Sequence, residues 1–422
     1  MPNLVTLDNG LRVLLIPVPH ARSVSLSAYV AAGSRFEAAP ADAGLSHFVE
    51  HLCFKGTERR PRPQDIAAEI DALGGSMNAA TDREYTTYYA KVIPDHAEQM
   101  LDVLGDVLRN SLFVPAEIER ERGVIIEELA AVEDSPDELA GVLLDELLWP
   151  GQPHGRDIAG SQESVAAISQ QRLIDYYHAQ YVPNATVLSI AGAVDEARML
   201  DLVRGHLGEW RAGAPEDWAR NVHVHGAQAR ALEKDTEQAH LTLGLLSASA
   251  TDPKRYPLTL LSIIVGEGMS SRLFMRLREE LGLCYDIHTS LTQLLDTGSF
   301  GVYAGVDPDN AVEAVREIAS ELRRAREPVS TAEFERAKSL VRSRIELSME
   351  DTRSVSAWYG GRASRGLPLE TPEEVMARFQ AVTIDEVTEV ARTTLRDEHL
   401  RLAAVGPFPS VEPLFEVASL DG

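Results

Sequence analysis

Residues 89–95 read YAKVIPD, and a related stretch, YAGVDPD, occupies residues 303–309, 214 positions later. Three further matches keep almost the same separation. They are AEIER at 116–120 with AEFER at 332–336, AIS at 167–169 with AVT at 381–383, and Gly192 with Gly406. Four matches in one order, separated by 214 to 216 residues, indicate an internal duplication. A period this long is typical of two related domains and not of a solenoid built from short repeats.

Each copy mixes short apolar strands with longer amphipathic helices. Residues 12–16 and 187–191 have the composition of buried strands. Helices are expected at 95–110, 115–133 and 170–179, with partners near 309–325, 331–349 and 384–394. Strands grouped with pairs of helices predict an α+β fold of two homologous halves, each a mostly antiparallel sheet covered by helices.

The boundary between the copies is expected where polar, turn-rich sequence follows the first copy. The stretch RAGAPED at 211–217 begins such a segment. We therefore expect an N-terminal domain at 1–212, a linker at 213–228 and a C-terminal domain at 229–422.

The composition is that of an acidic globular protein. The chain has 422 residues, 44% of them hydrophobic and 25% charged, and its net charge is −25. Such a charge disfavours phosphate backbones, so no nucleic-acid partner is expected. No apolar run reaches the ~18 residues of a membrane span, and the first residues do not resemble a signal peptide. The two cysteines, Cys53 and Cys284, exclude a disulfide framework and suit a reducing compartment, so we expect a cytoplasmic protein.

Residues 47–51 read HFVEH within an apolar stretch that predicts a helix. Histidines at i and i+4 project from one helix face, so His47 and His51 can bind one ion. Glu50 lies on the same side and can contact a metal-bound water as general base. The order H-x-x-E-H is that of an inverted zinc-peptidase motif. The alternative is that these three side chains decorate a half-exposed helix.

A catalytic zinc needs a third protein ligand and an open fourth position. The predicted helix at 115–133 offers Glu121 and Glu128, which are seven residues apart and therefore share a face. Ile125 lies between them on that face, whereas Glu127 points elsewhere. One of the two glutamates can bind the metal while the other orients the site. A solvated charged face would explain the same spacing.

The chain resembles the pitrilysin/insulinase family of zinc peptidases, and most closely the short-chain branch that includes the mitochondrial processing peptidases. The resemblance covers nearly the whole chain and rests on GLSHFVEHLCFKGT at 44–57, GGSMNAAT at 74–81, Tyr88 with Tyr89, and the glutamate pair. It implies that Glu128, 77 residues beyond His51, is the third ligand of one Zn²⁺ per chain. Glu121 then supports the site from outside the ligand set.

The same resemblance implies roles for Arg278 and Tyr285, which would hold the substrate backbone and stabilise the oxyanion. Chemistry alone is also compatible with Arg278 as a surface charge and Tyr285 as a core ring. We expect an extended peptide or unfolded segment to add as a strand beside residues 76–81, pairing near Asn78 and Ala79. In this branch a second subunit completes the chamber. Because one chain holds both the zinc motif and the Arg278/Tyr285 pair, we expect a homodimer; a heterodimer with an inactive homologue is the alternative.

The duplication gives an independent check on the metal site. Positions 47 and 51 correspond to Leu261 and Val265, and position 128 corresponds to Arg344. The second copy therefore lacks all three ligands, and the expected metal site belongs to the first copy alone. The main alternative function is a non-catalytic structural or peptide-binding subunit of the same fold. The complete set His47, Glu50, His51 and Glu128 argues for a zinc endopeptidase instead.

Overall fold

The computed structural model describes residues 2–421, and contacts divide them into two compact units. Unit 1 comprises the chain up to Leu129, Asp157–Ala219 and Glu346–Thr371. Unit 2 comprises Ala130–Arg156, Arg220–Ile345 and the chain from Pro372 onward. Among the described residues, every helix is too short or too polar to span a lipid bilayer.

Unit 1 contains a six-stranded sheet in the order β1-β2-β6-β3-β5-β4. All neighbouring strands are antiparallel except β2 and β6. The strands are β1 (Asn3–Thr6), β2 (Arg12–Pro17), β3 (Val24–Val30), β4 (Ser76–Thr81), β5 (Thr86–Val92) and β6 (Thr186–Gly192). The buried central strands β3 and β6 place the apolar core along the middle of the sheet, and β4 forms one edge.

Seven helices that lie in the first copy of the sequence contribute to unit 1. They are α1 (Leu45–Leu52), α2 (Pro63–Ala72), α3 (Ala97–Arg109), α4 (Pro115–Asp134, in unit 1 through Leu129), α6 (Gln162–Ala167), α7 (Gln170–Gln180) and α8 (Glu196–Leu207). Alternate residues of β2 reveal how the sheet is covered. Val13 and Leu15 join the large core with these helices, whereas Leu14 and Ile16 join a second cluster on the opposite face.

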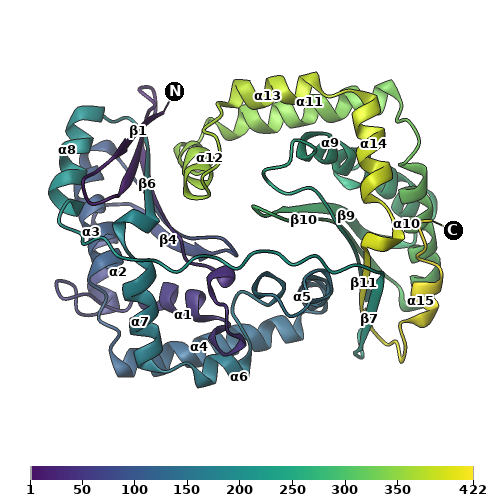
Figure 1. The fold of residues 1–422 in the computed structure, drawn as a ribbon, viewed down its shortest axis with the longest axis horizontal. Helices are drawn as coiled ribbons and strands as arrows, with labels where there is room; N and C mark the ends of the chain where they lie inside the picture. Colours follow the sequence, from purple (N-terminus) through teal and green to yellow (C-terminus); the bar gives the residue numbers. More distant parts are fainter. Residues whose placement is uncertain (1, 422) are drawn as a thin grey trace. The chain divides into compact units, whose positions relative to one another are not determined.

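The second cluster is completed by α12 (Thr352–Ser364), a helix from the other copy of the sequence (Figure 1). Val355, Tyr359 and Ala363 of α12 pack against the sheet of unit 1. Gly360 allows close approach, because a Cβ there would lie 2.4 Å from the Tyr29 ring and 2.9 Å from Ser189 Cβ. The sheet of unit 1 is therefore covered on both faces.

Unit 2 repeats this plan with a five-stranded sheet in the order β7-β11-β8-β10-β9. Only β7 and β11 are parallel, as are their counterparts β2 and β6. The strands are β7 (Gln228–Glu233), β8 (Ala239–Leu246), β9 (Cys284–Gln293), β10 (Gly298–Val306) and β11 (Leu400–Gly406). The shared strand order confirms the predicted α+β fold of two homologous halves with mostly antiparallel sheets.

Helices of unit 2 also come from both copies of the sequence. They are α5 (Pro136–Leu148), α9 (Arg255–Gly266), α10 (Ala311–Arg324), α11 (Thr331–Ser348, in unit 2 through Ile345), α13 (Pro372–Ala381), α14 (Ile384–Thr394), α15 (Glu412–Glu416) and a π-helix, η6 (Phe274–Glu280). Ala140 and Leu143 of α5 pack on Ala403 and Val405 of β11. Because α5 and α12 are equivalent in the duplication, the two copies have exchanged this helix.

The residues that join the two copies, 208–227, form neither helix nor strand. Those of them that belong to unit 1, residues 208–219, are nonetheless held in place. Asn184 exchanges hydrogen bonds with the backbone of Gly213, and the buried Arg35 donates to Ala219 O at 2.7 Å while stacking on Trp218. The linear division into 1–212, a linker at 213–228 and 229–422 stays a prediction, and the contacts additionally assign the stretch with α5 to unit 2 and that with α12 to unit 1.

Candidate metal centre

Helix α1 carries the two histidines and begins at a tightly constrained backbone. Gly44, at its N-cap, has φ = +89°, and a Cβ there would lie 2.3 Å from Ala159 O, so only glycine fits. The buried Glu37 accepts hydrogen bonds from Gly44 N (3.0 Å) and Ser46 N (2.7 Å). A carboxylate at a helix N-terminus satisfies free amides and interacts favourably with the helix dipole. The start of the histidine helix is therefore fixed.

His47 and His51 project from the same side of α1, with ring centroids 4.5 Å apart. Their side chains are mostly buried, with 19% and 17% of their surfaces exposed. Burial, and then the neighbouring His51, lower the pKa of His47 to about 4. His47 is therefore a neutral imidazole at neutral pH, the form that binds a metal ion.

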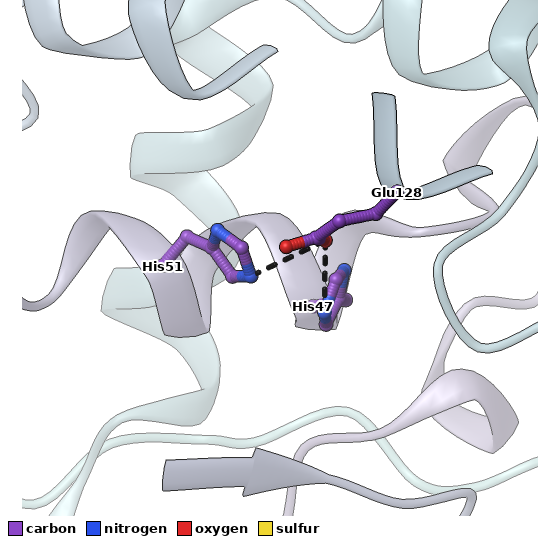
Figure 2. Close-up of side chains that lie close together, drawn as sticks. All are labelled: His47, His51 and Glu128. Carbon is purple, nitrogen blue, oxygen red and sulfur yellow. Dashed lines mark ion pairs between the residues drawn. The ribbon is translucent and has the colours of Figure 1, made fainter. Parts of the chain in front are cut away.

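Helix α4 brings Glu128 to this pair. Its Oε2 atom lies 4.0 Å from His47 Nε2 and 3.7 Å from His51 Nε2, and Figure 2 shows the carboxylate reaching toward both rings. One donor atom from each of the three residues falls within 4.8 Å of the others. Two imidazole nitrogens and a carboxylate oxygen match the ligand types of a catalytic zinc. The donors present fit the ion, and 46% of the Glu128 side-chain surface faces solvent.

Glu121 lies two turns before Glu128 on α4, and only 5% of its side-chain surface is exposed. Its Oε2 atom is 3.1 Å from His51 Nδ1, and its Oε1 atom is 2.7 Å from Lys55 Nζ. Ile125, between the two glutamates, is fully buried. Glu127 is exposed and is absent from the donor cluster among the described residues.

Glu50 lies beside the cluster without belonging to it. Its side chain is buried, and Thr81 Oγ1 donates a hydrogen bond to Glu50 Oε2 at 2.6 Å. Burial raises the pKa of Glu50, and the Thr81 hydrogen bond opposes that rise by stabilising the charged carboxylate. An ionised carboxylate in this position, beside the histidine–glutamate cluster, can accept a proton from a neighbouring water.

Thr81 ends β4, the edge strand on which Asn78 and Ala79 lie. One side of β4 pairs with β5, and Asn78 is exposed. Asn78 Oδ1 accepts a hydrogen bond from Ala79 N at 2.8 Å. The structure thus connects an available strand edge directly to Glu50.

Arg278 and Tyr285 lie in unit 2, at the end of η6 and the start of β9. The Arg278 guanidinium stacks on the rings of Phe274 (4.9 Å) and Tyr285 (5.0 Å), and 76% of Tyr285 is exposed. The two residues are thus brought together as a pair. Their placement against the cluster of unit 1 stays a prediction.

The duplicated positions in unit 2 carry no metal ligands. Leu261 and Val265 are fully buried in the apolar helix α9, and Arg344 pairs with Glu267. Among the described residues, the histidine–glutamate cluster of unit 1 is the one group with metal-binding geometry.

Three residues around the site were not identified from the sequence as contributors to it. Glu37 caps α1, Lys55 binds Glu121, and Thr81 binds Glu50. Thr81 lies in the quoted glycine-asparagine motif, which is a usable signal. Lys55 lies in the motif quoted at 44–57, four residues after His51, and that position is a usable signal as well. Glu37 lies outside the quoted motifs.

The fold and the cluster together define a class: a duplicated α+β protein whose first unit carries two histidines and a glutamate poised for a metal. Comparisons with known proteins identify the family to which it belongs. Residues 12–162 match the family described as Insulinase (Peptidase family M16), and residues 167–341 match the family described as Peptidase M16 inactive domain.

Relatives cover almost the entire chain. An uncharacterized zinc protease of Mycobacterium leprae is 34% identical over 415 residues, spanning 97% of this chain and 92% of its own length. One from Bacillus subtilis is 32% identical over 405 residues, spanning 95% and 97%. The chain belongs to the M16, or insulinase, family of peptidases, which confirms the resemblance seen in its motifs.

Solved structures share the fold. A protease from Helicobacter pylori superposes with a TM-score of 0.92 at 20% identity, covering 96% of this chain and 99% of its own. A protein from Pseudomonas fluorescens described as a peptidase M16 inactive domain gives a TM-score of 0.89 at 18% identity, covering 97% and 99%. These likenesses establish the two-unit M16 fold.

Proposed function

We propose that this protein is a zinc-dependent endopeptidase that cleaves peptides or unfolded segments bound in extended form. The observation that carries the proposal is the convergence of His47, His51 and Glu128, with the separate carboxylate of Glu50 beside them. The relatives named as zinc proteases support the same activity. His47, His51 and Glu128 would hold one zinc ion per chain.

Individual residues of the chain have separate roles in the proposed reaction. Zinc, when bound, supplies Lewis acidity toward the scissile carbonyl and the attacking water. Glu50, ionised and with Oε2 held by Thr81, accepts a proton from that water at Oε1 and returns it to the leaving amine. Glu121 orients His51 through Nδ1, so that Nε2 remains available as a ligand.

The edge strand β4 is the proposed site for the substrate backbone. An extended peptide would pair with β4 near Asn78 and Ala79. Because this pairing uses backbone groups, it selects peptides that are extended and does not require a particular substrate sequence. Arg278 and Tyr285 of unit 2 are proposed to hold the substrate and stabilise the oxyanion, consistent with the exposure of the tyrosine.

The proposal also includes the cellular compartment and the oligomeric state of the protein. Two buried, free cysteines suit a reducing cytoplasm, and a homodimer is proposed because one chain carries both the zinc motif and the arginine–tyrosine pair. Light scattering on the purified chain tests this state. A monomer with full activity would contradict the dimer.

The decisive experiment measures zinc content and cleavage of an unfolded peptide, in the wild-type protein and in Glu50→Gln. The amide keeps the size of the side chain but cannot accept the proton, so we expect retained zinc with a loss of activity of at least 100-fold. Glu127→Gln, at an exposed position outside the cluster, serves as the control. Full activity of Glu50→Gln would refute the mechanism, and a zinc-free wild type would favour a non-catalytic subunit.

A further inference from the structure

Lys55 contacts Glu121, and Glu121 in turn contacts the proposed zinc ligand His51. Its ammonium lies 2.7 Å from Glu121 Oε1, and the other oxygen of that carboxylate lies 3.1 Å from His51 Nδ1. The Glu121 side chain is 5% exposed, and these two contacts engage one oxygen each. A buried carboxylate without a cationic partner is costly, so the lysine is part of what allows Glu121 to sit beside the histidine.

The backbone around Lys55 is held on both sides. Lys55 N donates to Leu52 O at 3.0 Å, continuing the turn that ends α1. Gly56, at φ = +133°, accepts a hydrogen bond from Leu112 N at 3.1 Å, and the buried Thr57 donates to Asp106 at 2.6 Å. Only 26% of the Lys55 side-chain surface is exposed. The ammonium is therefore placed by a fixed segment, and little entropy is lost in ordering it.

We infer that Lys55 is a positioning residue for the metal centre, acting through Glu121 on His51. A carboxylate bound at one oxygen by Lys55 cannot turn freely, so its other oxygen stays on His51 Nδ1. His51 Nε2 then keeps facing Glu128, as it does in the structure at 3.7 Å. The inference rests on the proposed function, because it assigns Lys55 a part in holding the same zinc.

The expected effect is a loss of zinc affinity. Direct hydrogen-bond partners of metal-bound histidines typically contribute 10–100-fold to affinity. Lys55 acts one contact further away, so Lys55→Met should weaken zinc binding by about tenfold, at the lower end of that range. Lys55→Arg keeps the cation and should recover most of the affinity. The cobalt-substituted Lys55→Met protein should show a shifted visible spectrum, because the geometry of the His51 ligand changes.

The test is a double-mutant cycle with four proteins: wild type, Lys55→Met, Glu121→Gln and the double variant. The zinc Kd of each is measured against a competing chelator. If Lys55 acts through Glu121, adding Lys55→Met to Glu121→Gln should change the Kd by less than twofold. Thermal unfolding of the metal-free proteins separates loss of affinity from loss of folding. Lys254→Met, at the exposed N-cap of α9, controls for removing one positive charge.

Each outcome has a definite meaning. Equal or tighter zinc binding by Lys55→Met, or an equal loss in both backgrounds, overturns the inference. If Lys55→Met does not fold, Lys55→Gln enters the same cycle. A wild type that binds no zinc overturns the proposed function and this inference together. A wild type that binds zinc while every Lys55 variant matches it overturns this inference alone.

Discussion

At the scale of single residues, Glu50 experiences two opposing influences. Burial raises its pKa, while the hydrogen bond from Thr81 favours the charged form. The carboxylate must be ionised to accept a proton, so activity should fall as the pH drops through the Glu50 pKa. Thr81 therefore extends the active range toward acidic pH.

Thr81→Val should move the acid limb of the kcat/KM profile to higher pH. Valine has nearly the same shape but cannot donate, so the pKa of Glu50 rises further above its ordinary value. The variant should lose more activity at acidic pH than at alkaline pH. The measurement is kcat/KM from acidic to alkaline pH, with Ser76→Ala at the opposite end of β4 as control. An equal loss at every pH would contradict this role for Thr81.

The same residue scale shows how much of the site could be predicted. His47, Glu50 and His51 follow from spacing within one helix, and Glu121 shares a face with Glu128 for the same reason. The contact of Lys55 with Glu121 depends on where a turn leaves α1 relative to α4. No sequence period describes such a contact. The contacts of Lys55 with Glu121 and of Thr81 with Glu50 therefore appear only in the structure, although both residues lie in motifs quoted from the sequence.

At the scale of elements, the exchanged helix α12 depends on close contact with the sheet of unit 1. Ser356 Oγ lies within hydrogen-bond distance of both Ser27 Oγ and Ser189 O, at 3.0 Å from each. Gly360 and Gly361 are adjacent, but only Gly360 meets the sheet. Around Gly361 no atom lies within 4 Å of a Cβ position. Alanine substitutions at these two positions therefore distinguish the effect of helix propensity from the effect of packing against the sheet.

Gly361→Ala should stabilise the protein by about 0.5–1 kcal/mol, because alanine favours the helix. Gly360→Ala gains the same propensity but forces a methyl group against Tyr29 and Ser189, so a net loss of about 1–3 kcal/mol is expected. Urea unfolding of the two variants measures the difference. Equal stabilities would mean that α12 does not pack on this sheet as closely as the structure shows.

At the scale of the whole molecule, the duplication could be predicted but the helix exchange could not. The four sequence matches fall on equivalent elements, such as β5 with β10 and β6 with β11. Amphipathic periodicity identifies which face of α5 or α12 is buried. It does not identify the sheet that covers that face. A helix packed on its own copy and one packed on the other copy have the same sequence pattern.

Acidic pH should destabilise unit 2, because it breaks an ion pair between the start of α11 and the segment before η6. Arg272 Nε lies 2.6 Å from Glu333 Oε1, and this ion pair, helped by hydrogen bonds from Ser330, lowers the pKa of that carboxyl to about 2. The folded pKa lies below the unfolded one, so the stabilisation is present above pH 4.5 and is lost as the pH falls toward 2. Arg272→Met should therefore reduce stability at neutral pH and have a diminishing effect toward pH 2.

Urea midpoints of the wild type and Arg272→Met across this pH range test the ion pair. Arg316→Met, which breaks a half-exposed pair with Glu313, serves as the control and should change little. A difference between wild type and Arg272→Met that stays constant from neutral pH to pH 2 would contradict the assignment.

A fragment ending at Ala219 should not fold stably, although it contains all six strands of the first sheet. It lacks Glu346–Thr371, so the cluster of Leu14, Ile16 and Tyr29 on one sheet face loses its cover. The fragment is expected to bind the dye ANS through this exposed apolar surface and to lack a cooperative thermal transition.

Joining residues 346–371 to the fragment through a flexible linker should restore the transition, because α12 can return to the sheet. Joining residues 372–397, a stretch of equal length from unit 2, should not restore it. If the bare fragment melts as cooperatively as the joined one, the first copy of the sequence is a self-sufficient domain and α12 is dispensable to it.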